Sequence, residues 1–109
     1  MIELKKLQVD RKRIIKIPVT NGNSEVEQID LAIWHKPLTP ALIEELDAIE
    51  ASDRERLVCH LAAVLTRWDI VEDGAAIEPS IENLQRLEYE TLTAMREAVF
   101  SPLYPKLTT

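Results

Sequence analysis

Glycine and cysteine are almost absent from this chain of 109 residues. Gly22 and Gly74 are its only glycines, so it has no glycine-rich loop of the kind that cradles phosphate groups. Cys59 is its only cysteine, which rules out a disulfide within the chain. No apolar run approaches the roughly 20 residues that a membrane-spanning helix needs, and no secretory signal pattern is visible. We therefore expect a protein of a reducing cytoplasm.

Histidine is equally scarce, and the two that occur do not form a recognisable site. Neither His35 nor His60 has a cysteine, histidine or carboxylate at a metal-ligand spacing. Cys59 and His60 are adjacent, so on a helix their side chains point about 100° apart and cannot form a catalytic pair. The acidic stretch from Asp69 has Ser80 where a calcium-binding EF-hand closes with glutamate. The sequence thus predicts no catalytic, cofactor-binding or metal-binding residue, and we expect a protein that is not an enzyme.

Positive charge is concentrated at the start of the chain. The net charge is −6, yet residues 1–16 carry +4, so the remainder carries −10. An acidic body repels nucleic acids and anionic membranes, which leaves the basic start as the only candidate surface for a polyanion. Such a charged end is usually a solvated segment. Trp34 and Trp68 lie in acidic or neutral stretches, whereas nucleic-acid binding favours aromatic residues interleaved with basic ones. This distribution argues against membrane contact and disfavours nucleic acid as a partner.

Two segments within residues 14–35 alternate between apolar and polar side chains, as half-buried strands do. The apolar positions are Ile15, Ile17 and Val19 in the first segment and Ile29, Leu31 and Ile33 in the second. Between the segments, Asn21-Gly22 supplies the positive φ angles of a tight turn, so we predict an antiparallel hairpin. Pro18 lacks a ladder donor, which places the first strand at a sheet edge or ends it there. Residues 1–12 leave open a third short strand.

Helical signals dominate from Thr39 onward. Thr39 is a suitable N-cap, and Pro40 suits the first helical position. Ser52 and Glu55 have the spacing of a capping box, in which each side chain satisfies an unpaired backbone donor. The following helix has an apolar stripe at helical spacing, which consists of Leu57, Leu61, Val64, Leu65 and Trp68. Because only a narrow strip of that helix is polar, we expect it to lie at the centre of the helical part.

Two further helices are predicted after an acidic loop over residues 69–79. Ser80 caps a short helix with Ile81, Leu84 and Leu87 directed inward. The last helix runs from about Tyr89 to Phe100, and Pro102 stops it. The sequence therefore predicts one α+β domain over residues 1–109, with an N-terminal antiparallel β-hairpin followed by a bundle of three to four helices. Its parts are a basic segment 1–13, a hairpin 14–35, a helical part 39–101 and a loose tail 102–109.

The order of several short motifs resembles the tail assembly chaperones of long-tailed, siphovirus-like phages and prophages. The motifs are Pro18-Val19-Thr20, Asn21-Gly22, Trp68-Asp69, Gly74, Pro79-Ser80, Asn83-Leu84 and Leu87, with a final helix that ends near Phe100. The resemblance covers roughly residues 14–101. The chain departs from the family at Leu87-Glu88, where Leu-Pro is common, and at Ala75-Ala76, where a small polar residue is common.

The resemblance implies a role without enzymatic activity. Proteins of this family bind the helical tape-measure protein, help recruit tail-tube subunits, act in the cytoplasm of the bacterial host and are absent from the mature virion. A longer form made by translational frameshifting is common among them. Two other hypotheses remain open: a head–tail connector or minor tail structural protein, and a small nucleic-acid-binding regulator that uses the basic N-terminus. Self-association into a homo-oligomer is open as well.

The last helix and the tail form the predicted partner-binding surface. Its apolar residues are Leu92, Met95, Val99, Phe100, Leu103 and Tyr104. A chaperone of helical proteins needs exposed apolar stripes or grooves, and methionine adapts to varied partners. The alternative is that this helix packs onto the second helix as part of the core, since a small domain needs its apolar area for its own stability.

Overall fold

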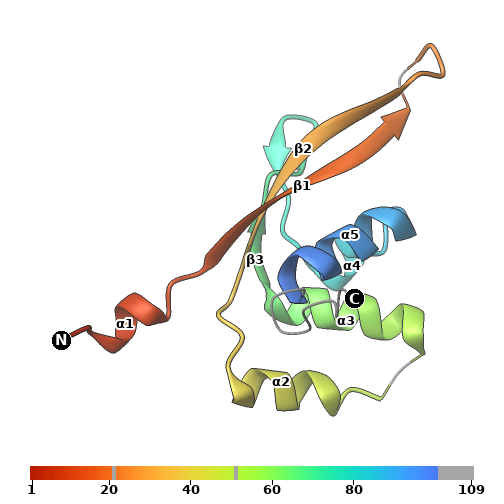
Figure 1. The fold of residues 1–109 in the computed structure, drawn as a ribbon. Helices are drawn as coiled ribbons and strands as arrows, with labels where there is room; N and C mark the ends of the chain where they lie inside the picture. The colour runs from red at the N-terminus through yellow and green to blue at the C-terminus, as the bar shows by residue number, and fades with distance from the viewer. Residues whose placement is uncertain (21, 51, 101–109) are drawn as a thin grey trace, which may run out of the picture.

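An antiparallel sheet of three strands packs on one face against helices (Figure 1). The computed structural model describes residues 1–20, 22–50 and 52–100. In chain order the elements are α1 (Leu4–Leu7), β1 (Arg11–Thr20), β2 (Val26–His35), α2 (Pro40–Asp47), α3 (Asp53–Val64), β3 (Leu65–Trp68), β4 (Val71–Glu72), β5 (Ala75–Ala76), α4 (Ile81–Leu84) and α5 (Tyr89–Phe100). The α+β class and the N-terminal hairpin are therefore as predicted.

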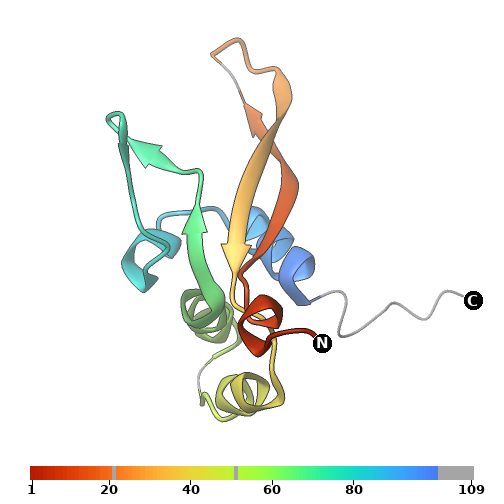
Figure 2. The same ribbon diagram turned by 90° about the vertical axis from the view of Figure 1, so that its left-hand side faces the viewer.

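Strands β1 and β2 form the predicted hairpin, and β1 is an edge strand of the sheet, whose order is β1-β2-β3. Ile15 pairs with Leu31, and Ile33 pairs with Arg13, so these residues share the inward face. Alternation of side chains along each strand sends their neighbours to the outward face. Pro18 lies within β1, at an edge where its missing donor is tolerated. The hairpin extends well beyond the helices, and the β4–β5 hairpin forms a second, separate projection (Figure 2).

The third strand of the sheet is β3, and its position corrects two predictions. Residues 1–10 contain the short helix α1 and no strand, and Arg11 and Lys12 begin β1 instead of forming a strand of their own, whereas Leu65–Trp68 is a strand rather than the end of a helix. Leu65 and Trp68 are buried and the two residues between them are exposed. A register shift at Trp34/His35 of β2 accommodates this spacing. The apolar spacing fits a helix, but the free edge of β2 supplies backbone partners that only a strand can use.

The predicted acidic loop contains a tight two-stranded hairpin. Val71 pairs with Ala76 across a turn in which Asp73 and Gly74 have positive φ angles of 52° and 81°. Such a turn favours glycine, because a Cβ is strained there. The indole Nε1 of Trp68 donates to the carbonyl of Ile77 at 2.7 Å. The hairpin is thereby held against the end of β3.

The predicted helix starts are confirmed by their caps. The hydroxyl of Thr39 accepts from the backbone N–H of Leu42 at 3.2 Å, and that of Ser52 accepts from Glu55 at 3.3 Å. Ser80 caps α4 in the same way through the N–H of Asn83. These contacts satisfy donors that the first turn of a helix leaves unpaired.

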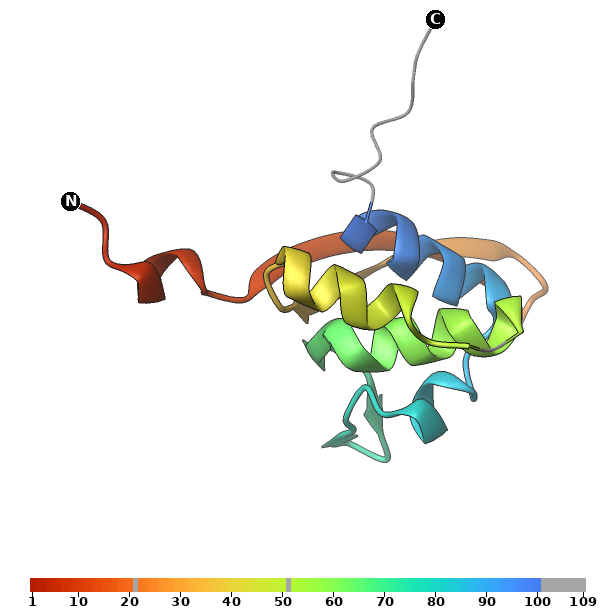
Figure 3. The same ribbon diagram turned by 90° about the horizontal axis from the view of Figure 1, so that it is seen from below.

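The core lies between the inward face of the sheet and the helices α3, α4 and α5. Its fully buried apolar side chains are Ile33, Leu61, Val64, Leu84, Met95 and Val99. Helix α3 contacts both α4 and α5, and α5 contacts β1, so α3 is central as predicted (Figure 3). Ile81 differs from the prediction, since 48% of it is exposed. Helix α1 buries no residue and lies far from the core (Figure 3).

Candidate functional site

The described residues do not assemble a metal site. Among them, no three histidine, cysteine, aspartate or glutamate side chains gather as metal ligands would. None of the helices in residues 1–20, 22–50 and 52–100 is long and apolar enough to cross a membrane. His60 has a structural contact, because its Nε2 lies 2.9 Å from the carbonyl oxygen of Leu46 and links α3 to α2.

The residues predicted to bind a partner lie mostly inside the molecule. Leu92, Met95 and Val99 are 4%, 0% and 0% exposed, and they pack in the core as the alternative prediction for this helix had it. Phe100 is half-buried. Leu103 and Tyr104 lie outside the described residues. The physical reason is the size of the domain, whose core includes the apolar face of α5. The side of α5 next to β1 and the N-terminal end of α5 each line a groove.

A groove of about 610 Å³ runs between β1 and α5. We call it the edge groove; its lining residues are Arg13, Ile14, Ile15, Lys16, Ala94, Glu97 and Ala98. The four residues of β1 are consecutive, and only the edge of a strand presents consecutive residues to one neighbour, because alternate side chains point to opposite faces. The three residues of α5 have the i, i+3, i+4 spacing of a single helical stripe. The groove therefore lies along the free edge of β1.

The direction of the backbone groups of β1 follows from a hydrogen bond on the far side of β2. The N–H of Asp69 donates to the carbonyl of Ala32 at 3.0 Å, so the backbone of Ala32 faces β3. The backbone groups of the residues on either side of Ala32 in β2 therefore face β1. Ile14, which is paired with Ala32, directs its own N–H and C=O away from β2. Alternate residues of a strand direct their backbone groups to the same side, so those of Lys12 and Lys16 also point away from β2. Pro18 lies on the same side, and its missing N–H therefore removes no hydrogen bond to β2, which explains why proline is tolerated there.

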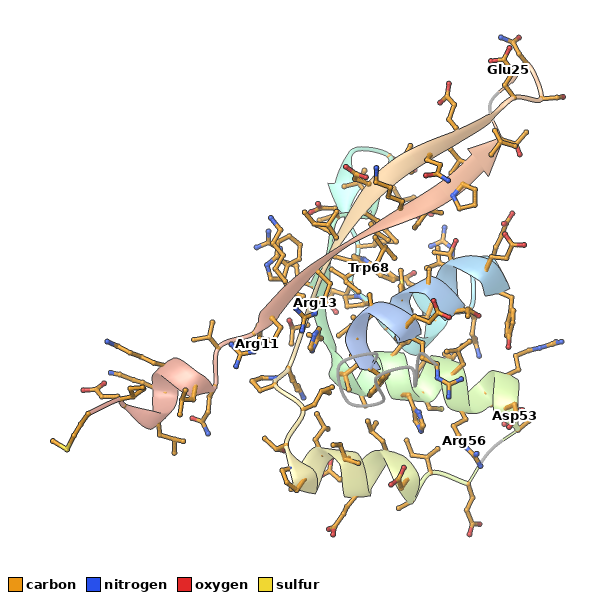
Figure 4. The ribbon with its side chains drawn as sticks, viewed as in Figure 1. Arg11, Arg13, Glu25, Asp53, Arg56 and Trp68 are labelled. Atoms are coloured by element: carbon orange, nitrogen blue, oxygen red, sulfur yellow. The ribbon has the colours of Figure 1, made fainter. Side chains whose placement is uncertain are left out.

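Two buried polar atoms lie near the start of the edge groove. Within the described part of the chain, Nε of Arg13 and Nε2 of His35 have no hydrogen-bond partner. His35 is 1% exposed, and its Nδ1 lies 2.7 Å from the carbonyl of Lys36, to which it must donate. Burial lowers the pKa of His35, and the charges of Arg13 and Arg11 lower it further against the hydrogen bond to Lys36. Figure 4 shows Arg11 and Arg13 at the end of β1 nearest α1.

A second groove of about 440 Å³ lies between the first turns of α3 and α5 and the segment after α4. We call it the helix groove; its lining residues are Arg54, Glu55, Val58, Gln85, Leu87, Tyr89 and Leu92. Val58 and Leu92 are buried and form an apolar floor, while Leu87 is half-buried. Tyr89 is 62% exposed at the rim, and Arg54 and Glu55 bring both signs of charge. Such a site accepts apolar side chains and holds polar neighbours at its edge.

The outward face of the sheet contains a cluster that the sequence reading missed. The Lys12 ammonium lies 5.3 Å from the centroid of the Trp34 ring, and the Arg67 guanidinium carbon lies 4.0 Å from it. The three residues come from adjacent strands, since Trp34 pairs with both Lys12 and Arg67. The prediction that Trp34 lies in acidic or neutral surroundings was therefore wrong. Arg67 is distant in sequence from Trp34 and lies in the stretch that the sequence pattern predicts to be a helix; only the recognition of β3 would have revealed the contact.

Comparison of the chain with models of known protein families, with curated proteins and with solved structures gave no match. A functional assignment therefore depends on the sequence motifs and on the surfaces described above.

Proposed function

We propose that this protein is a non-enzymatic assembly chaperone of phage or prophage tails. In this role it binds the tape-measure protein in the cytoplasm of the bacterial host, helps recruit tail-tube subunits and leaves before the virion is complete. The observation that carries the proposal is the motif order from Trp68 to Leu87, which resembles that family. Three features of the molecule support it.

The first supporting feature is that these motif residues act as one structural unit. Trp68 holds the β4–β5 hairpin through Ile77, and Gly74 provides the left-handed position of its turn. Asn83 donates from its side chain to the carbonyl of Glu78 at 2.8 Å, which fixes the chain just before α4. Leu84 is fully buried in the core. The motifs thus have a common physical purpose, which is to orient the chain between α3 and α5.

The second supporting feature is that this unit leads directly to the helix groove. Leu87, the last residue of the motif order, lines the groove together with Val58 and Leu92. A helical client offers apolar residues at i, i+3 or i+4, and a small groove with an apolar floor binds side chains at that spacing. The volume of about 440 Å³ has room for individual side chains rather than a whole helix. We infer that successive apolar side chains of the tape-measure helix are bound there.

The third supporting feature is the net charge of −6. A chaperone must keep an apolar, aggregation-prone client in solution, and acidic net charge favours solubility.

Co-expression with the tape-measure protein of the same phage or prophage tests the proposal. Wild-type protein should co-purify with the tape-measure protein and increase its soluble fraction. Tyr89→Asp places a charge at the rim of the helix groove and should weaken retention at least tenfold. Val71→Asp is the matched control, because Val71 is similarly exposed, at 60%, but lies on β4. No association of the wild-type pair would overturn the proposal, and stoichiometric protein in purified virions would instead support a connector or minor tail protein.

One observation favours a second candidate, a nucleic-acid-binding regulator. Lys12 and Arg67 form a cationic cluster with Trp34 on the outward face of the sheet. However, Arg67 already stacks on the indole ring, so the ring is not free to stack on a base. Binding of an oligonucleotide that falls steeply with added salt and is lost in Lys12→Ala would support this candidate. Absence of binding at low salt would remove it.

A further inference from the structure

We propose that the edge groove binds an extended, acidic segment of a partner protein, which adds to the sheet as a fourth strand beside β1. This surface is separate from the helix groove, and it would recognise a partner through backbone hydrogen bonds rather than through the side chains of a helix. Within the described part of the chain, β1 pairs only with β2. A free edge of this kind is a template for another strand.

The free edge offers a defined set of hydrogen-bonding groups. The N–H and C=O of Lys12, Ile14 and Lys16 point away from β2, as derived above from the contact between Asp69 and Ala32. Pro18, the next residue on that side, has no N–H and limits the ladder. The added strand therefore pairs with the stretch from Lys12 to Lys16, which is the stretch along which the edge groove runs.

The helix side of the groove carries small side chains. A strand that pairs with β1 lies about 4.8 Å from it in the plane of the sheet, and so runs alongside α5, which packs against β1. The residues of α5 that line the groove include Ala94 and Ala98, one helical turn apart, and their methyl side chains permit close approach. Glu97 is exposed at the rim. The groove of about 610 Å³ thus borders the free edge of β1 and has small side chains on its helix side.

The charge of β1 indicates an acidic occupant. Residues 11–20 contain Arg11, Lys12, Arg13 and Lys16 and no acidic residue. A second copy of β1 is a poor occupant, because antiparallel pairing about Ile14 would set Lys12 directly opposite Lys16. A partner strand with carboxylates opposite these cations is favoured by the same rule. The single carboxylate on the helix side, Glu97, favours apolar or neutral residues where the added strand faces it.

Arg13 provides a specific anchor for one of those carboxylates. Its Nε is buried and has no hydrogen-bond partner among the described residues, which is a costly state for a charged donor. An acidic side chain on the inward face of the added strand, opposite Arg13, would accept from this atom. The groove therefore predicts a ligand with acidic residues opposite Lys12, Arg13 and Lys16 and apolar residues opposite Ile14 and Ile15.

A labelled peptide tests this mode of binding directly. The probe is a nine-residue peptide with the core Glu-Val-Val-Glu-Glu between serines, titrated against the full chain and followed by fluorescence anisotropy. Peptide residues opposite Lys12, Ile14 and Lys16 direct their N–H groups toward β1, so N-methylation at the first, third and fifth core positions should weaken binding at least tenfold. N-methylation at the second and fourth positions is the matched control and should leave binding unchanged. Amide hydrogen exchange should slow at Ile14 and Lys16 when the peptide is bound.

Two variants of the protein separate groove binding from simple charge attraction. Ala98→Leu fills the groove without changing the charge and should weaken binding of the peptide at least tenfold, whereas Ala75→Leu on the exposed β5 should leave this binding unchanged. Ile14→Pro removes an outward N–H that β2 does not use and should have the same effect as Ala98→Leu. Circular dichroism establishes that each variant is folded.

Several results would overturn the inference. Equal binding of the two N-methylated peptides, or unchanged exchange at Ile14 and Lys16, would show that the peptide does not pair with β1. Dimerisation of the protein alone that is lost in Ile14→Pro would make a second copy the occupant instead. Displacement of the peptide by a single-stranded oligonucleotide, with full binding retained in Ala98→Leu, would assign the cations to nucleic acid.

Discussion

The inward and outward faces of the β1–β2–β3 sheet consist of alternate residues of the same strands, and their environments differ sharply. Ile33 is fully buried on the inward face against the helices, whereas Ile14 on the outward face is 63% exposed. Beside Ile14, Trp34 is held by Lys12 and Arg67 in a cationic cluster. Apolar burial is therefore concentrated on the inward face, and we expect substitutions at exposed positions of the outward face and the edge to leave the protein folded.

The largest expected difference between the faces is in stability. Ile33→Ala removes a fully buried side chain and should lower the free energy of unfolding by about 2–5 kcal/mol. Ile14→Ala should change it by no more than about 0.5 kcal/mol. Urea denaturation of both variants measures the contrast. Similar losses in the two would mean that the outward face is covered in solution and would break the comparison.

His35 gives the inward face a dependence on pH. The folded state favours the neutral imidazole, because burial lowers its pKa from the ordinary 6.5. The unfolded chain therefore binds the proton more readily, and stability should fall as the pH drops below about 6.5 and level off below the folded pKa. His35→Asn, whose side-chain amide can still donate to the Lys36 carbonyl, should lose this component. Urea denaturation between pH 7.5 and 5.5 compares the two, and an identical slope would contradict the assignment to His35.

The inward face also depends on the turn that follows β3. Trp68 is buried and donates to Ile77, and that contact relies on the β4–β5 hairpin. Gly74 has a φ of +81°, and an added Cβ would meet no atom within 4 Å, so Gly74→Ala introduces backbone strain without a clash. The expected loss is about 1–2 kcal/mol. Gly22→Ala is the control and should cost less, because Gly22 has no positive φ. Thermal unfolding of both variants provides the measurement.

How much of this architecture could be predicted depends on how local the cause is. The caps Thr39, Ser52 and Ser80 act on backbone donors within three residues, and each of these helix starts was predicted. Strand β3 was missed because its partner, β2, lies about 30 residues earlier and the apolar spacing of Leu65 and Trp68 fits a helix equally well. Pairing between distant strands overrides such local patterns.

The candidate sites were less predictable for the same reason. To predict the edge groove, one must know which residues of β1 direct their backbone groups away from β2, and the hydrogen bond between Asp69 and Ala32 reveals this. One must also know where α5 lies. The apolar stripe of α5 could not be assigned from the sequence, because such a stripe looks the same whether a core or a partner covers it; Met95 is fully buried, whereas Leu92 also lines the helix groove.

The smallest expected effect lies on the outward face and tests whether its cluster contributes to folding at all. Arg67→Gln removes the cation that stacks on Trp34 at 4.0 Å, and an exposed interaction of this kind is worth about 0.5–1 kcal/mol. Lys12→Gln should cost less, because its ammonium lies farther away, at 5.3 Å. Neither variant should alter the pH dependence of the free energy of unfolding that is assigned to His35. Urea denaturation at low and at moderate salt gives the difference between the two variants. A loss above about 2 kcal/mol in Arg67→Gln would mean that the outward cluster is a structural part of the fold, and the division between a stabilising face and a free face would no longer hold.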